Sequence, residues 1–131
     1  MDRSPWKVLL VDDEQQFVST LAERLELRGI AARVAYNGDQ ALEAVEIDAP
    51  NIIVLDVIMP GMKGLEVLRH VKAKHPEVQV ILLTGQGATR DGIEGMRLGA
   101  FDYMIKPLDI EALVEKMEEA YNVALQARNM E

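Results

Sequence analysis

The most informative part of this chain is Asn51-Ile-Ile-Val-Leu-Asp56-Val-Ile-Met-Pro-Gly-Met-Lys-Gly64. Residues 52–55 form a short apolar run rich in β-branched side chains, which predicts a strand buried on both faces. The strand ends abruptly in a carboxylate, Asp56, and a turn containing Pro60 and Gly61 follows at once. Open α/β sheets bind their ligands at the carboxyl ends of such strands. Asp56 is therefore the first candidate for a functional residue.

Apolar runs of strand character alternate with amphipathic segments of helical period along the rest of the chain. The predicted strands cover residues 7–11, 31–35, 51–55, 78–83 and 101–105. The predicted helices cover residues 14–28, residues 39–46, residues 65 to the break at His75-Pro76, residues 89–98, and the segment from Asp109, with a frayed tail from about residue 126. This repeated alternation predicts an α/β domain, in which right-handed crossovers join the strands of a parallel sheet and helices cover both faces.

The composition fits a single domain that spans residues 1–131, with a core over about residues 6–125. Hydrophobic residues make up 49% of the chain, which is enough for a sizeable core. The 14 basic and 22 acidic residues give a formal net charge of −8, which disfavours direct binding of nucleic acid. The chain has no cysteine, no signal peptide and no apolar run long enough to cross a membrane, so we expect a cytoplasmic protein without membrane contacts.

Four of the predicted strands end in polar residues, namely Asp12 and Asp13, Asp56, Thr84 and Lys106. The carboxyl ends of parallel strands share one edge of a sheet, so these side chains are expected to meet in one pocket. Carboxylates roughly 4 Å apart repel each other by on the order of 4 kcal/mol per pair at an effective dielectric constant of about 20. A hard divalent cation relieves this repulsion, and oxygen ligands alone suit Mg²⁺ or Mn²⁺.

The same residues suit phosphoryl transfer. An aspartate carboxylate can act as a nucleophile toward phosphorus and form an aspartyl phosphate. Such a reaction depends largely on positioning and on the neutralisation of charge. Lys106 offers a positive charge to one phosphoryl oxygen, and the Thr84 hydroxyl can donate a hydrogen bond to another. The pattern makes Asp56 a candidate phosphoacceptor.

Four segments carry a resemblance to a known family, and their order and spacing match it across essentially the whole chain. They are Leu10-Val-Asp-Asp-Glu14, Leu55-Asp-Val-Ile-Met-Pro-Gly-Met-Lys-Gly-Leu-Glu66, Leu83-Thr-Gly85 and Gly99-Ala-Phe-Asp-Tyr-Met-Ile-Lys-Pro107. Together they resemble the receiver domain of two-component response regulators. The resemblance implies a doubly wound, flavodoxin-like (βα)5 domain whose five parallel strands lie in the order 2-1-3-4-5.

The resemblance also implies roles for the acidic residues. Asp56 receives a phosphoryl group from a sensor histidine kinase or a phosphotransfer protein. Asp13 and Asp56 bind Mg²⁺ directly, and Asp12 acts mainly through a bound water. The backbone carbonyl of Ile58 completes the protein ligands. In this view the chain is a signalling domain that catalyses only its own phosphorylation and dephosphorylation, and it is not an enzyme for other substrates.

The resemblance also implies which residues take part in the conformational change that follows phosphorylation. Thr84 and Lys106 contact the phosphoryl oxygens, and Tyr103 changes rotamer as Thr84 moves toward the phosphate. The peptide bond between Lys106 and Pro107 is expected to be cis. The face that signals to an effector protein or domain, and that can also join a homodimer, is made by helix 89–98, strand 101–105 and the helix from residue 109.

Two positions beside the expected phosphoryl group depart from the family's usual residues. Ile58 lies two residues after Asp56, and Gln86 lies two residues after Thr84. In the family these positions flank the path of the hydrolytic water. An aliphatic side chain at Ile58 neither orients water nor carries charge, so we expect this pair to set part of the lifetime of the phosphorylated state.

Two glycines, Gly92 and Gly95, lie inside the predicted helix 89–98. Each weakens a helix interior by about 1 kcal/mol relative to alanine. They are either incidental to packing, or they make this helix an element of low stability that is suited to switching.

Two other function classes compete with the phosphorylated switch. A receiver-fold interaction module would bind a partner without phosphorylation, but such a module usually loses an acid or the lysine, and this chain keeps them. A phosphatase or nucleotide-binding enzyme of doubly wound type is the second alternative. The glycine-rich phosphate loop expected after the first strand of a nucleotide-binding protein is replaced here by Asp12-Asp13-Glu14.

Overall fold

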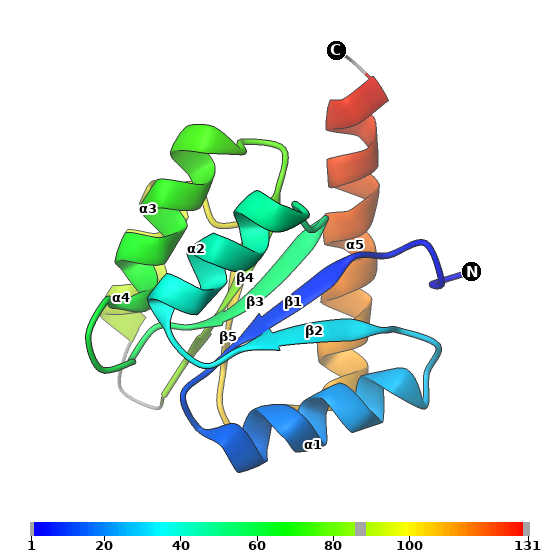
Figure 1. Ribbon diagram of the computed structural model, residues 1–131, viewed down its shortest axis with the longest axis horizontal. Coiled ribbons are helices and arrows are strands. Elements are labelled where there is room, and N and C mark those ends of the chain that lie inside the picture. Colours follow the sequence, from blue (N-terminus) through cyan, green and yellow to red (C-terminus); the bar gives the residue numbers. More distant parts are fainter. Residues whose placement is uncertain (1, 86–88, 130–131) are drawn as a thin grey trace.

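The computed structural model describes residues 2–85 and 89–129, along which strands and helices alternate (Figure 1). The elements are β1 (Val8–Val11), α1 (Gln15–Glu26), β2 (Ala32–Ala35), α2 (Gly38–Ile47), β3 (Ile52–Asp56), α3 (Gly64–Lys74), β4 (Gln79–Thr84), α4 (Thr89–Arg97), β5 (Asp102–Ile105) and α5 (Ile110–Asn129). The predicted bounds agree with these to within two residues, except at the C-terminus. The prediction of a frayed tail from about residue 126 is wrong, because α5 continues to Asn129 without a glycine or proline to end it.

The sheet is parallel throughout, and its strand order is β2-β1-β3-β4-β5. This order confirms the predicted doubly wound, flavodoxin-like arrangement. The strand β3 lies at the centre, where Leu55 pairs with Val11 of β1 and Asp56 pairs with Leu83 of β4. The carboxyl ends of these three strands therefore lie side by side at one edge of the sheet.

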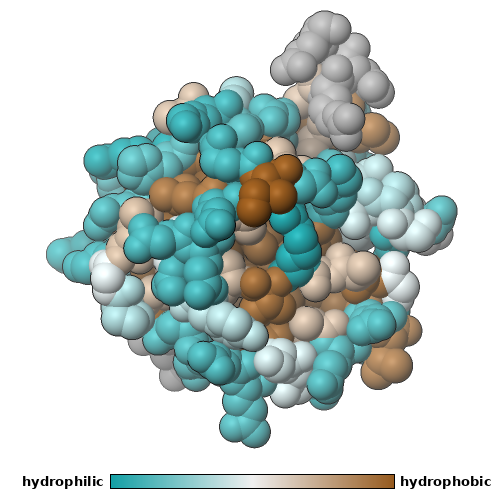
Figure 2. Space-filling view, in the orientation of Figure 1, coloured by the Kyte–Doolittle hydropathy of each residue, from teal (hydrophilic) through white to brown (hydrophobic). Residues whose placement is uncertain are grey.

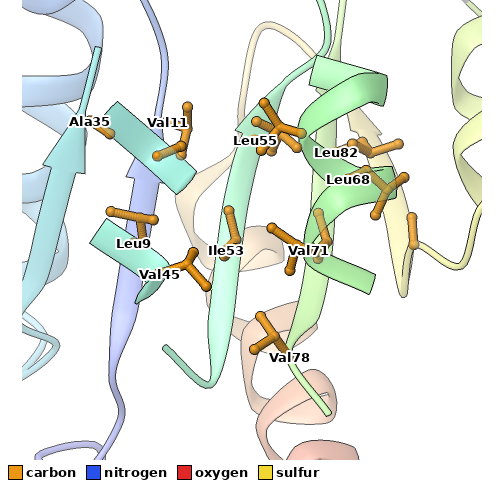
Figure 3. Close-up of a cluster of buried hydrophobic side chains, with 14 of the residues drawn as sticks. Leu9, Val11, Ala35, Val45, Ile53, Leu55, Leu68, Val71, Val78 and Leu82 are labelled. Atoms are coloured by element: carbon orange, nitrogen blue, oxygen red, sulfur yellow. The ribbon is translucent and has the colours of Figure 1, made fainter. Parts of the chain in front are cut away.

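Hydrophobic side chains form a separate core on each face of the sheet. In β1, Leu9 and Val11 belong to one core and Val8 and Leu10 to the other, as the alternation of side chains along a strand requires. The first core is covered by α2 and α3 (Figure 3), and the second by α1 and α5. The strands β1, β3 and β4 are buried along their whole length, which explains why their sequences are almost entirely apolar.

The surface in Figure 2 is mostly hydrophilic, with several apolar side chains among the charged ones. Two of the most exposed apolar residues are Leu27, just after α1, and Ile47, at the end of α2. Scattered apolar residues of this kind are normal on a folded domain. Within residues 2–85 and 89–129, no helix has the length and the apolar character that crossing a membrane requires.

Candidate functional site

The carboxyl edge of the sheet gathers the polar residues that the sequence places at the strand ends. Asp12 and Asp13 follow β1, Asp56 ends β3, Thr84 ends β4, and Lys106 follows β5. One carboxylate oxygen from each of the three aspartates lies within 4.8 Å of the other two. Asp12 and Asp56 are almost fully buried, whereas Asp13 is exposed. A set of oxygen donors this close together, open on one side, fits a hard divalent cation such as Mg²⁺ or Mn²⁺.

The loop between β3 and α3 fixes the position of the Asp56 carboxylate. The backbone N–H of Ile58 donates a hydrogen bond to Asp56 Oδ1 at 3.2 Å, and the N–H of Gly64 donates to the Val57 carbonyl at 3.0 Å. A Cβ atom on Gly64 would lie 2.7 Å from the Val57 Cα and would also meet the Asp56 carbonyl oxygen. Only glycine allows α3 to begin this close to the strand end that carries Asp56.

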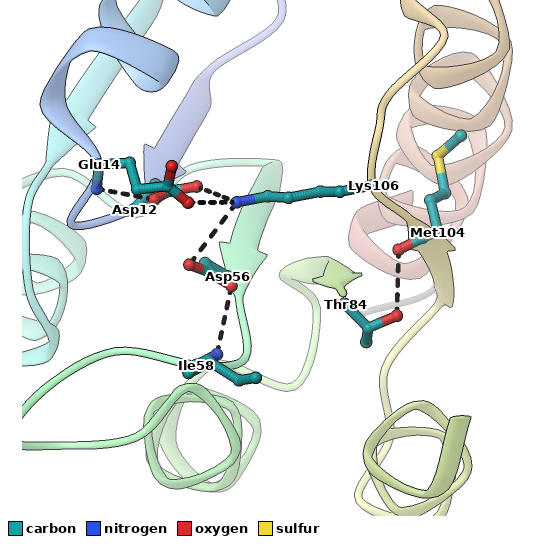
Figure 4. A network of polar contacts seen from close by, with 7 residues as sticks. All are labelled: Asp12, Glu14, Asp56, Ile58, Thr84, Met104 and Lys106. Atoms are coloured by element: carbon teal, nitrogen blue, oxygen red, sulfur yellow. Dashed lines mark hydrogen bonds and ion pairs between the residues drawn. The ribbon is translucent and has the colours of Figure 1, made fainter. Parts of the chain in front are cut away.

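Lys106 reaches from the end of β5 across to the acidic side of the pocket (Figure 4). Its Nζ lies 3.0 Å from Asp12 Oδ2, 3.3 Å from Glu14 Oε1 and 3.7 Å from Asp56 Oδ2. The peptide bond between Lys106 and Pro107 is cis. The lysine was predicted at this edge of the sheet, but its contact with Glu14 was not.

Burial and neighbouring charges perturb the proton affinities of both central groups. Loss of solvation, followed by the negative charge of Asp12, raises the pKa of Asp56 to about 6, although Lys106 and the Ile58 N–H oppose this shift. Burial lowers the pKa of Lys106, but its hydrogen bond to Asp12 and the charge of Asp56 outweigh burial, so the net pKa is raised. Around neutral pH the pocket therefore contains a firmly charged lysine beside a carboxylate that ionises less readily than usual.

Thr84 lies at the same edge, but its hydroxyl is directed away from Asp56 (Figure 4). The side chain is fully buried, and its Oγ1 donates a long hydrogen bond of 3.5 Å to the carbonyl oxygen of Met104 in β5. Lys106 thus forms ion pairs with Asp12 and Asp56, whereas the Thr84 hydroxyl bonds to the neighbouring strand β5.

The helix α4 packs closely against the sheet through its two glycines. A Cβ atom on Gly92 would lie 2.7 Å from the ring of Tyr103, which is half-buried in β5, and a Cβ atom on Gly95 would collide with Leu82. Both glycines therefore allow close approach and are not incidental to packing. Their proposed effect on the stability of α4 stays a prediction.

The pair expected to tune the phosphorylated lifetime can be placed only in part. The side chain of Ile58 is exposed at the mouth of the pocket, with 63% of its surface accessible. An apolar group in that place offers no hydrogen bond to a water molecule. Gln86 lies outside the residues that the structure describes.

Two residues at the start of α1 contact Lys106 and were not predicted to do so. They are Glu14, through its carboxylate, and Phe17, whose ring centroid lies 4.3 Å from Lys106 Nζ. The position of Glu14 directly after the two aspartates was a usable signal. Phe17 carried no distinct signal, because its spacing also fits the apolar face of a core-packing helix.

The fold and this pocket define a class, namely a flavodoxin-like α/β domain with clustered acids and a lysine at the carboxyl edge of its sheet. A family model described as the response regulator receiver domain matches residues 8–118. The chain therefore belongs to the response regulator receiver domain family of two-component signalling systems.

Individual relatives agree with this assignment. The chain is 39% identical over 111 residues to the transcriptional regulatory protein CpxR of Escherichia coli strain K12, covering 85% of this chain and 47% of that protein. It is 35% identical over 113 residues to the uncharacterized transcriptional regulatory protein YkoG of Bacillus subtilis, covering 86% and 50%. The crystal structure of the NtrX receiver domain from Brucella abortus matches with a TM-score of 0.84 and 32% identity, covering 88% of this chain and 98% of that one.

The chain spans about half the length of the curated relatives that it matches. Those relatives are named as transcriptional regulatory proteins. The comparisons therefore do not support the expectation, drawn from the net charge of −8, that the protein makes no direct contact with nucleic acid.

Proposed function

We propose that Asp56 accepts a phosphoryl group from the phosphohistidine of a sensor histidine kinase or a phosphotransfer protein. An Asp56 carboxylate oxygen forms a bond to phosphorus while the bond between phosphorus and the donor's imidazole nitrogen breaks. The electron pair of that bond stays on the imidazole, and the product is an aspartyl phosphate. The observation that carries the proposal is the position of this nearly buried carboxylate, which lies among two other acids and 3.7 Å from Lys106.

In this proposal Asp13, Asp56 and the backbone carbonyl of Ile58 bind the metal directly, and Asp12 acts mainly through a bound water. These donors are all oxygen, which suits Mg²⁺ and also Mn²⁺. When bound, the ion offsets the negative charge that the acids and the phosphoryl group bring together. Asp56 must be ionised to act as a nucleophile, and because its pKa is raised in the metal-free pocket, protons compete with Mg²⁺ for this carboxylate at weakly acidic pH.

The readout in this proposal begins at Thr84. Its hydroxyl leaves the Met104 carbonyl and donates to a phosphoryl oxygen, while Lys106 pairs with another. The space that Thr84 vacates, together with the close contact between Tyr103 and Gly92, couples the pocket to α4. The face formed by α4, β5 and α5 then signals to an effector protein or domain, or joins two copies of the chain.

The consequence of that signal is also a proposal. Because relatives that extend beyond this stretch are named as transcriptional regulators, control of transcription is the output that we favour for the whole protein. The cytoplasmic location stays a prediction. Ile58 and Gln86 are proposed to set part of the lifetime of the phosphorylated state. Ile58→Asn should change the dephosphorylation rate, and an unchanged rate would remove this role.

The phosphoacceptor proposal is tested by incubating the protein with Mg²⁺ and a small phosphodonor such as acetyl phosphate, followed by intact mass measurement. One hydroxylamine-sensitive phosphoryl adduct is expected, and it should be absent in Asp56→Asn, which keeps the size of the side chain. The absence of an adduct with small donors and with kinases would favour an interaction module that works without phosphorylation. Rapid turnover of the donor without an adduct would favour an enzyme.

A further inference from the structure

Lys106 has two kinds of partner in the pocket. Its Nζ contacts Asp12 at 3.0 Å and Asp56 at 3.7 Å, and both of these acids belong to the set that can hold a cation. It also contacts Glu14 Oε1 at 3.3 Å and lies 4.3 Å from the centroid of the Phe17 ring. The second pair lies on α1 and outside the cation site, so these contacts can persist when a cation is bound.

Helix capping does not explain where the Glu14 side chain lies. Glu14 is the N-cap residue of α1, a position at which Ser, Thr, Asp or Asn usually accepts a hydrogen bond from the first turn. Among the described residues, the Glu14 carboxylate accepts no such capping bond. It extends toward Lys106 instead, while its backbone N–H donates to Asp12 Oδ1 at 2.9 Å and fixes the turn.

Phe17 lies three residues further along α1, which places it on the same side of the helix as Glu14. Its half-buried ring faces the ammonium at a distance suited to a cation–π contact. The Phe17 ring and the Glu14 carboxylate therefore form a small binding site for an ammonium group beside Asp12 and Asp56. The Lys106 side chain has 20% of its surface exposed and the Glu14 side chain 64%, so solvent reaches the carboxylate and the ion pair has the modest strength of an exposed pair.

We propose that Glu14 and Phe17 are positioning residues that give Lys106 a resting place outside the cation site. This inference rests on the proposed function, because it assumes that Asp12 and Asp56 are needed for Mg²⁺. Without Glu14, the ammonium pairs only with those two acids and competes with the cation for them. Glu14 therefore strengthens Mg²⁺ binding by acting on Lys106, and the lysine stays within reach of Asp56 for the arriving phosphoryl group.

A double-mutant cycle on Mg²⁺ affinity tests this coupling without any phosphoryl transfer. Calorimetric titration is done on the wild type, Glu14→Gln, Lys106→Met and the double variant. Since exposed ion pairs are worth up to about 1 kcal/mol, Glu14→Gln should raise the Kd about two- to fivefold. In the Lys106→Met background the same change should have no effect. An equal rise in both backgrounds would overturn the proposal, because Glu14 would then act by its charge alone.

A matched control separates local pairing from a change in net charge. Glu23 is an exposed acid further along α1, and Glu23→Gln removes the same charge from the same helix. Its Kd for Mg²⁺ should match that of the wild type. A rise as large as that of Glu14→Gln would contradict a specific role for Glu14.

The Phe17 contact has a direct spectroscopic signature. The ε-protons of Lys106 should show an upfield ring-current shift in the NMR spectrum, with and without Mg²⁺. The shift should disappear in Phe17→Leu and remain in Phe17→Tyr, which keeps a ring and guards against an effect of misfolding. Equal Lys106 shifts in the wild type and in folded Phe17→Leu would overturn this part of the proposal. A wild type that binds no Mg²⁺ would instead count against the proposed function, while this spectrum would still report the resting place.

Discussion

The two sides of the pocket differ in how far they are assembled (Figure 4). On the side of β1 and β3, Lys106 is joined to Asp12 and Asp56 by contacts of 3.0 and 3.7 Å. On the side of β4 and β5, the Thr84 hydroxyl is bonded to the Met104 carbonyl at 3.5 Å and is turned away from Asp56. The groups proposed for chemistry are therefore in place before the reaction, whereas the group proposed for signalling has to move.

Two glycines show the same contrast in packing. On the assembled side, a side chain at Gly64 would meet backbone atoms of Asp56 and Val57, which cannot shift without moving the carboxylate. On the other side, a side chain at Gly92 would meet the ring of Tyr103, which can rotate about its own bonds. The backbone atoms at Gly64 cannot move aside, whereas the Tyr103 ring at Gly92 can. A substitution at Gly64 should therefore destabilise the protein more than one at Gly92.

The largest effect is expected for Gly64→Ala. The added methyl group should force the β3–α3 loop away from Asp56 and destabilise the fold by about 3 kcal/mol, as overpacking of a tight site does. Urea unfolding followed by circular dichroism measures this loss. Gly85→Ala is the control, because no described atom lies within 4 Å of a Cβ at Gly85. Similar stability of the two variants would contradict the rigid contact.

The next largest effect is expected for the pH dependence of the stability of the metal-free protein. The pKa of Asp56 is raised from 3.8 in the unfolded chain to about 6 in the folded one, so the folded state binds more protons between these values. The free energy of unfolding should therefore fall, by on the order of 2–3 kcal/mol from this group, as pH rises from about 4 to about 6. Asp56→Asn removes this contribution, so its stability relative to the wild type should improve over the same range.

Denaturant unfolding in EDTA at several pH values measures that difference, and the acids far from Asp56 cancel between the two proteins. At saturating Mg²⁺ and near neutral pH, the wild type should become the more stable of the two proteins. The ion stabilises the folded wild type, whereas Asp56→Asn has lost one of its ligands. A difference between the two proteins that does not vary with pH would show that Asp56 is not desolvated as the structure indicates.

A smaller effect is expected for Thr84→Val. The resting structure loses only one long hydrogen bond, so the stability should fall by about 1 kcal/mol or less. Asp56 should still be phosphorylated, but the chemical-shift changes that phosphorylation causes in α4 and at Tyr103 should largely disappear. Normal shift changes in this variant would indicate that the signal does not pass through the Thr84 hydroxyl.

The smallest effect on stability is expected for Gly92→Ala. Alanine favours the helix by about 1 kcal/mol, and displacement of the Tyr103 ring offsets part of this gain. The net change should stay within about 1 kcal/mol of zero, while the ring resonances of Tyr103 should move. A loss as large as that of Gly64→Ala would remove the contrast between the two sides of the pocket.

The sequence was sufficient to predict the sheet and the positions of the acids. Asp12, Asp13 and Asp56 follow apolar runs of similar length, Lys106 follows a strand interrupted by Asp102, and parallel strands of similar length end at one edge. The direction of the Thr84 hydroxyl could not be predicted in the same way. Its rotamer depends on the carbonyl of a residue in β5, and no local pattern in the sequence encodes that contact.

Local sequence patterns could not predict the contacts of Lys106 with Glu14 and Phe17 either. Phe17 has the spacing of a core residue, and it does pack at the border of the second core as well as under the ammonium. An acid at an N-cap is commonly explained by the helix dipole alone. Only the placement of β5 relative to α1 shows that Glu14 and Phe17 face the same lysine.

In the proposed function Asp56, and neither of the neighbouring aspartates, is the nucleophile. The most direct measurement treats the protein with acetyl phosphate and Mg²⁺, reduces it with sodium borohydride, and locates the product by peptide mass spectrometry. Borohydride converts an aspartyl phosphate into homoserine and leaves free aspartate unchanged. We predict homoserine at position 56 alone. Homoserine at position 12 or 13 would identify a different nucleophile, and a phosphorylated protein with no homoserine at position 56 would also rule out Asp56.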